Sequence, residues 1–152
     1  MKVALFIRVS TKEQAREGLS LAAQEDLLRK YCKLYEYTVY GVYCDDGYSA
    51  KNTKRPALER LFTDIENHLF DAVIVWKLTR ISRNTIDLLK MISFFEKNGV
   101  HFVSYSEQFD TGSPFSALYR NAVLTLSEIV SLSNSAILAR KGRTHSNTNF
   151  GI

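Results

Sequence analysis

The chain has 152 residues, of which 45% are hydrophobic and 24% are charged, with only two prolines. This composition excludes a disordered or collagen-like chain and predicts one compact globular domain. The net charge of +4 permits a polyanionic partner, although many proteins without such a partner carry a similar excess. The first apolar run, residues 3–7, is too short for a signal peptide or a membrane span, so we expect a cytoplasmic protein.

Four apolar segments predict the strands of one sheet. Residues 3–7 and 72–76 are continuous runs rich in β-branched and aromatic side chains, as expected for central parallel strands covered on both faces. Residues 37–43 and 100–104 are more mixed and predict further strands nearer the sheet edges. We therefore expect a mostly parallel sheet of at least four strands.

The segments between the predicted strands change to the period of a helix. The apolar spacing after residue 20 predicts a first helix. Pro56 suits the first turn of a second helix over residues 56–67, because its missing N–H costs nothing there. Asn84 as an N-cap and Asn98-Gly99 as an end signal bound a third helix. Strands that alternate with helices define an α/β fold.

Two other segments are interpreted by their patterns. Residues 11–19 show no clean period and are interpreted as a mobile loop. From Phe115 an apolar stripe continues to Val130, which predicts a long C-terminal helix. We therefore expect an α/β core over residues 1–112, a long helix over 113–145 for core covering and oligomerisation, and a disordered tail over 146–152.

Basic and hydroxyl side chains follow two of the predicted strands. Arg8 and Ser10 lie on one face, because side chains alternate along a strand, and the pair could share one phosphate. Arg80 and Arg83 stand at a strand-to-helix junction and could converge on the same carboxyl edge of the sheet. Arginine binds phosphate oxygens bidentately but is a poor proton acceptor, so this pattern suits attack on a phosphodiester.

Each cluster also has a simpler structural interpretation. Ser10 could serve merely to cap or turn the chain after its strand. Arg80 and Arg83 could be surface residues paired with acidic neighbours. Arg55 could be a solvated residue before a helix. Taken singly, the clusters favour these interpretations, so the functional hypothesis depends on their combination.

Their combination and order closely resemble the serine recombinase family of resolvases, invertases and large integrases. The resemblance covers residues 2–112. Within the family, the sequence is most similar to the large integrase and transposon branch. It depends on segments in a fixed order: Arg8-Val9-Ser10-Thr11; Gln14 with Gly18-Leu19-Ser20-Leu21 and Gln24; Asp45-Asp46-Gly47-Tyr48-Ser49; Lys54-Arg55-Pro56; Trp76-Lys77-Leu78; Arg80 with Ser82-Arg83-Asn84; and Phe109-Asp110-Thr111.

The resemblance implies a catalytic domain of a site-specific DNA recombinase. Ser10 would attack the scissile phosphate to give a 5′-phosphoserine link, and strand exchange and religation would follow. The resemblance implies no metal or nucleotide cofactor, and it implies double-stranded DNA and further copies of the chain, as dimers and tetramers, as partners. The other site residues it implies are phosphate-binding Arg8, Arg80 and Arg83, assisting Arg55, and supporting Gln24 and Asp46, with Asp45 the alternative to Asp46.

The sequence departs from the family pattern at two places. Thr79 stands where the family usually has an aspartate, and Val130-Ser131 replace an acidic-basic pair in the final helix. These departures support an alternative, a non-catalytic assembly or regulatory domain of the same fold. The chain contains no evident helix-turn-helix, zinc motif or coiled coil, so we expect a fragment of a longer recombinase.

Two alternatives from other classes fit the sequence poorly. A generic flavodoxin-like phosphate-binding protein would need a glycine-rich loop after the first strand, and residues 10–14 contain no glycine. A Ser-His-Asp hydrolase would need a histidine opposite Ser10, and no motif places His68, His101 or His145 there.

Overall fold

The structure is a computed structural model that describes residues 1–10, 19–47, 55–114, 121, 125, 128, 129, 132 and 136–140. It divides into two units, Met1–Ser116 and Ala117–Ile152. The residues described in the second unit are helical. The predicted loop at 11–18, most of the predicted final helix and the predicted tail lie outside the described residues.

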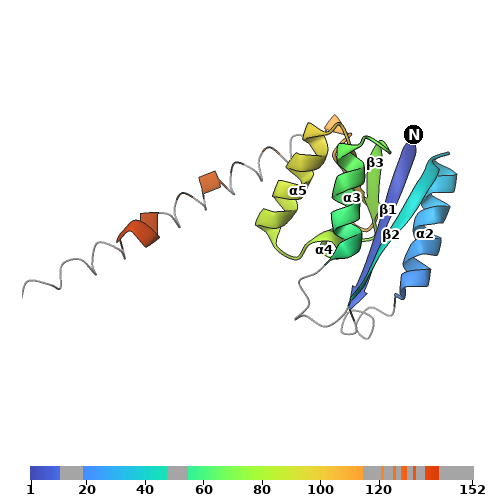
Figure 1. Cartoon of the computed structure of the whole chain (residues 1–152), viewed down its shortest axis with the longest axis horizontal. Helices are drawn as coiled ribbons and strands as arrows, with labels where there is room; N and C mark the ends of the chain where they lie inside the picture. Colours follow the sequence, from blue (N-terminus) through green and yellow to red (C-terminus); the bar gives the residue numbers. More distant parts are fainter. Residues whose placement is uncertain are drawn as a thin grey trace, which may run out of the picture. The chain divides into compact units, whose positions relative to one another are not determined.

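The first unit is built on one five-stranded sheet (Figure 1). Its spatial order is β2-β1-β3-β4-β5, with the first four strands parallel and β5 antiparallel to β4. The predicted α/β class and the four predicted strands are confirmed. The strand bounds are β1 (Lys2–Ser10), β2 (Thr38–Gly47), β3 (Ala72–Val75), β4 (His101–Ser104) and β5 (Phe109–Asp110).

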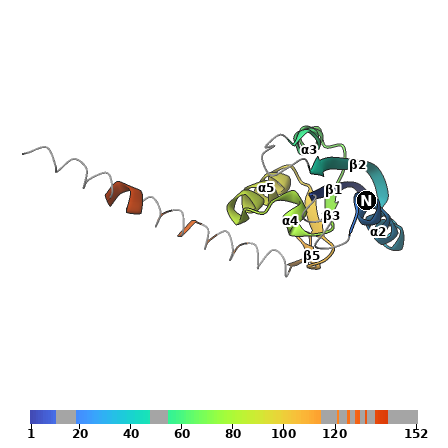
Figure 2. The same ribbon diagram turned by 90° about the horizontal axis from the view of Figure 1, so that it is seen from below.

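Helices cover both faces of this sheet (Figure 2). The helix bounds are α2 (Leu21–Leu34), α3 (Pro56–Glu66), α4 (Leu78–Ile81) and α5 (Thr85–Lys97). The three predicted helices in this part of the chain are confirmed as α2, α3 and α5. The one-turn helix α4 was not predicted, because one turn is too short to show a period. Within the described part of the chain, no helix is long and apolar enough to cross a membrane.

The central strand β1 is buried on both faces. Leu5 points to the α2 side and joins a core cluster with Leu28. Phe6 points to the opposite side and joins a second cluster with Leu61 and Phe95, from α3 and α5. This double burial explains why β1 is a continuous apolar run rather than an alternating one. It also places Arg8, two residues after Phe6, on the α3 and α5 side of the sheet.

Helix α5 begins and ends where the sequence predicted. The Asn84 side-chain oxygen accepts a hydrogen bond from the Asp87 N–H at 3.1 Å, and Gly99 just past the end has φ of 69°. That left-handed conformation favours glycine. The end signals in the sequence therefore correspond to the observed caps.

Replacing Asn84 with alanine should lower the free energy of unfolding by about 1 kcal/mol, because one N–H of the first turn loses its acceptor. Urea unfolding followed by circular dichroism measures this change. Lys90→Ala, at an exposed position of the same helix, is the matched control and should change stability by less. Equal stability of Asn84→Ala and the wild type would contradict the capping role.

Candidate active site

The site lies at the carboxyl edge of the sheet, where β1 and β2 extend beyond β3. Phe6 pairs with Val75, the last residue of β3, whereas β1 continues to Ser10, which pairs with Gly47 on β2. Helix α4 follows β3 and lies beside this extension of β1. Parallel strands bring their carboxyl ends to one edge, which is where α/β folds place ligands.

Two arginines from distant segments meet on α4. The Arg8 guanidinium donates to the carbonyl oxygens of Thr79 at 2.9 Å and Arg80 at 3.0 Å. The Arg55 guanidinium donates to the Arg80 carbonyl at 3.2 Å and to the Ile81 carbonyl. The last carbonyls of a helix have no partner within the helix, so the guanidiniums satisfy them. Helix α4 thereby brings the guanidiniums of Arg8 and Arg55 together.

The two arginines predicted in the second cluster have different environments. Arg80 lies on α4 and is 1% exposed, among the largest fully buried side chains in the described residues. This burial contradicts its simpler interpretation as a surface residue. Arg83 is exposed in the turn between α4 and α5. The cluster therefore supplies one arginine from inside the domain and one at its surface.

Asp45, near the end of β2, holds the segment that contains Arg55. One carboxylate oxygen accepts the Ala57 N–H at 2.9 Å and the other accepts the Leu58 N–H at 3.2 Å, at the start of α3. The Arg55 Nε lies 3.8 Å from the same carboxylate. The carboxylate thus serves as an N-terminal cap and as a partner for the guanidinium. Arg55 is consequently fixed rather than solvated.

The Arg55 guanidinium lies in a partly buried and cationic environment. It sits 5.5 Å from the centroid of the Phe6 ring. Burial and, to a smaller extent, the nearby charge of Arg8 lower the pKa of Arg55 to about 10, although Asp45 acts in the opposite direction. Arg55 therefore remains protonated at neutral pH. Two positive charges held this close attract an anion.

Gln24 connects the start of α2 to the end of β1. It is fully buried, and its side-chain amide donates to the carbonyl oxygens of Arg8 at 3.2 Å and Leu19 at 3.4 Å. The first of these bonds fixes the backbone of Arg8, whose guanidinium binds the carbonyls of α4. The structure thus gives Gln24 a position consistent with the supporting role expected from the resemblance.

Two predicted site residues have side chains outside the described residues. Ser10 is the last residue of β1, and the structure gives its backbone pairing with Gly47 but not its side chain. Asp46 pairs through its backbone with Val9, and its side chain is likewise not described. Of the two aspartates left open by the sequence, Asp45 is the one with described contacts to the site.

Glu107 was missed by the sequence analysis. The Ser104 hydroxyl, at the end of β4, donates to its carboxylate, and both carboxylate oxygens lie 3.4 Å from the Leu78 N–H at the start of α4. No motif or period marks this residue, because its role depends on a contact between separate loops. A carboxylate thus reaches α4 although Thr79 provides none.

The site is suited chemically to a phosphate group. It combines the guanidiniums of Arg8 and Arg55, which meet on α4, with a strand that ends in a serine, and charge-assisted bonds from guanidiniums are strong and directional. Among the residues that the structure describes, no group of three or more His, Cys, Asp or Glu side chains is placed to hold a metal ion.

Comparisons with known proteins agree with this fold. The chain is 30% identical over 145 residues to the transposon Tn917 resolvase of Enterococcus faecalis, covering 91% of this chain and 70% of the resolvase. It is 27% identical over 125 residues to a DNA-invertase of Enterobacteria phage P7, of which it spans only 59%. The structure matches the N-terminal catalytic domain of TP901-1 integrase with a TM-score of 0.80 and 39% identity, over 88% of this chain and 99% of that domain.

The fold and the matches define a catalytic domain of the serine site-specific recombinase class. The family described as "Resolvase, N terminal domain" matches residues 3–144, and the chain belongs to it. The resemblance stated from the sequence is confirmed.

Proposed function

We propose that this domain cuts and rejoins double-stranded DNA, with Ser10 as the nucleophile. The observation that supports this most directly is the meeting of Arg8 and Arg55 on α4, beside the end of the strand that holds Ser10. Such a cationic cluster can stabilise the additional negative charge that develops on a phosphate under attack.

In the proposed reaction, the Ser10 hydroxyl oxygen attacks the phosphorus atom and its proton leaves. The bond between phosphorus and the 3′ oxygen breaks, the 3′ oxygen takes up a proton, and a 5′-phosphoserine ester remains. Attack by a 3′-hydroxyl of an exchanged strand reverses these steps and releases Ser10. The phosphodiester energy is conserved, so the reaction needs no nucleotide, and we expect no metal. Arg8, Arg80 and Arg83 would hold the phosphate while Arg55 assists.

The covalent intermediate provides the test. The protein would be incubated with fragmented genomic DNA of the organism that encodes it, and complexes that survive detergent would be isolated and sequenced. We expect enrichment of defined sites, and mass spectrometry of the attached peptide should place the nucleotide on Ser10. DNA binding without any covalent product would instead favour the non-catalytic assembly domain. The presence of Thr79 where the family usually has an aspartate also points to that alternative.

We also propose the finer points about partners. Copies of the domain would pair through the helix expected over residues 113–145, first as dimers and then as tetramers on two DNA sites. The support for this assembly is the family resemblance and the apolar stripe in the sequence. A protein that recombines DNA would work in the cytoplasm, and the net charge of +4 is compatible with a DNA partner.

Replacing Glu107 with alanine should slow cleavage about 10-fold, because small displacements of catalytic groups are costly and Glu107 holds the start of the helix that contains Arg80. Single-turnover rates at saturating DNA measure the effect on the chemical step separately from binding. Glu107→Gln keeps an acceptor and should recover part of the rate. The control is Glu66→Ala, at an exposed position on α3. A wild-type rate in Glu107→Ala would show that the contact has no positioning role.

A further inference from the structure

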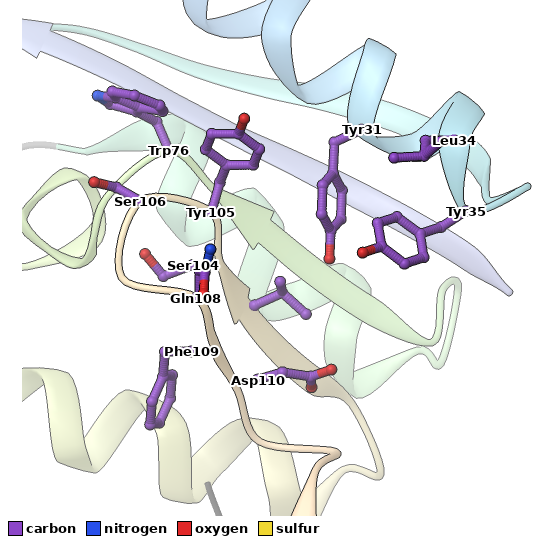
Figure 3. Close-up of a pocket in the computed structure, with 11 residues that line it drawn as sticks. Tyr31, Leu34, Tyr35, Trp76, Ser104, Tyr105, Ser106, Gln108, Phe109 and Asp110 are labelled. Carbon is purple, nitrogen blue, oxygen red and sulfur yellow. The ribbon is translucent and has the colours of Figure 1, made fainter.

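A second concave site lies away from the arginines, on the face of the sheet covered by α2. A cavity of about 680 Å³ opens between the end of α2 and the carboxyl ends of β3 and β4. Aromatic side chains form much of its lining, with Tyr31 on α2, Tyr35 just after that helix, and Trp76 and Tyr105 just after β3 and β4 (Figure 3). A volume of this size is typical of ligand sites in proteins.

The aromatic rings form a continuous wall. Trp76 and Tyr105 are stacked, with ring centroids 5.5 Å apart. Tyr105 meets Tyr31 edge to face at 5.7 Å, and Tyr31 lies 4.7 Å from Tyr35. Tyr35 is 52% exposed and Tyr105 is 37% exposed, so part of this wall faces solvent. The faces of aromatic rings carry negative electrostatic potential and attract cations.

One carboxylate lies among the aromatic rings of the cavity. Asp110 is the one ionisable acid among its described lining residues, and these include no lysine, arginine or histidine. Asp110 pairs with Val103, which belongs to the core cluster on the α2 side, so both face that side of the sheet. One Asp110 oxygen accepts the Gly112 N–H at 2.7 Å, which orients the carboxylate. A chain with a net charge of +4 thus places a carboxylate among the aromatic rings of this cavity.

The Tyr31 hydroxyl remains neutral in this environment. Burial raises the pKa of Tyr31 to about 12, with smaller contributions from Tyr35, Tyr37 and Asp110. The neutral Tyr31 hydroxyl can therefore accept a hydrogen bond from a cation, while Asp110 supplies the negative charge. No lysine, arginine or histidine lines the cavity in the described part of the chain, and Asp110 would repel a nucleic-acid backbone.

We propose that this cavity binds an arginine side chain presented by a partner polypeptide. The planar guanidinium would stack on the tyrosine rings and donate to the Asp110 carboxylate. Guanidinium suits the site better than ammonium, because it is planar, weakly hydrated and able to donate two parallel hydrogen bonds. The exposed edge at Tyr35 leaves room for the partner's backbone. This inference does not depend on DNA cleavage.

The test uses the protein's single tryptophan, which lines the cavity. The full chain would be titrated with a blocked Gly-Arg-Gly peptide while Trp76 fluorescence is recorded. We expect a saturable change, and about 10-fold weaker binding of the same peptide with citrulline, a neutral isostere of arginine. Equal binding of the citrulline peptide, or a change that does not saturate, would overturn the proposal. Equal binding of a lysine peptide would overturn the preference for guanidinium.

Protein variants locate the binding. Asp110→Asn keeps the acceptor for the Gly112 N–H and removes the charge, so it should weaken binding about 10-fold. Tyr35→Leu removes a half-exposed ring and should also weaken binding, and it remains informative if Asp110→Asn fails to fold. Tyr40→Leu removes an exposed tyrosine outside the cavity and should bind as the wild type does. Unchanged affinity in both cavity variants would overturn the assignment.

Discussion

Replacing Ser10 with alanine should abolish the covalent protein–DNA product, a loss of at least about 10⁴-fold, because alanine has no oxygen to attack phosphorus. The fold should be unaffected, since the end of β1 is held by backbone pairing with Gly47 and by the bond from Gln24 to the Arg8 carbonyl. Denaturing gels with end-labelled DNA measure the product, and band shifts measure DNA binding.

Ser106→Ala is the matched control for this experiment, because Ser106 is an exposed serine beyond β4. It should form the covalent product at the wild-type rate. Persistence of the product in Ser10→Ala would assign the nucleophile to another residue. Loss of DNA binding in Ser10→Ala would mean that the variant tests the fold instead of the chemistry.

Removing the Arg80 guanidinium should slow cleavage by about 10³-fold or more, the magnitude typical of arginines that stabilise a phosphoryl transition state. Because Arg80 is 1% exposed, alanine would also leave a cavity and destabilise the domain. Arg80→Met is the better variant, since methionine fills much of the same volume without charge. Thermal unfolding checks the fold, and single-turnover cleavage measures the rate.

Arg29→Met provides the comparison for Arg80→Met. Arg29 is an exposed arginine of α2 that pairs with Glu25 at 2.8 Å, and its loss should leave cleavage unchanged. A folded Arg80→Met variant that cleaves within about 10-fold of the wild type would exclude a catalytic role for this guanidinium.

Periodicity predicted the parts of the fold that depend on burial. The apolar run of β1 and the apolar spacing in α3 and α5 correspond to buried side chains, such as Phe6, Leu61 and Phe95 in the core cluster under α3 and α5. The period of two also predicted that Arg8 and Ser10 share one face, and the bonds of Arg8 to α4 give the position of its side chain. The placement of the Ser10 side chain stays a prediction.

Local patterns could not predict the features that arise from contacts between distant segments. Helix α4 has one turn and β5 has two residues, so neither is long enough to show a period. The burial of Arg80 runs against the usual preference of arginine for the surface. Asp45 reaches the start of α3, but the side chain of Asp46 lies outside the described residues, so the supporting role of Asp46 stays a prediction. Glu107 was recognisable only through its contacts with Ser104 and Leu78.

The dependence of α4 on other elements has a consequence for how the site assembles. A single helical turn has no stability of its own in water. Here its first N–H faces Glu107, and its last carbonyls receive Arg8 and Arg55. The turn can persist only while the segments at both of its ends are folded around it. The cationic edge is thus a product of global cooperativity, and a partly folded chain would expose these arginines without aligning them for chemistry.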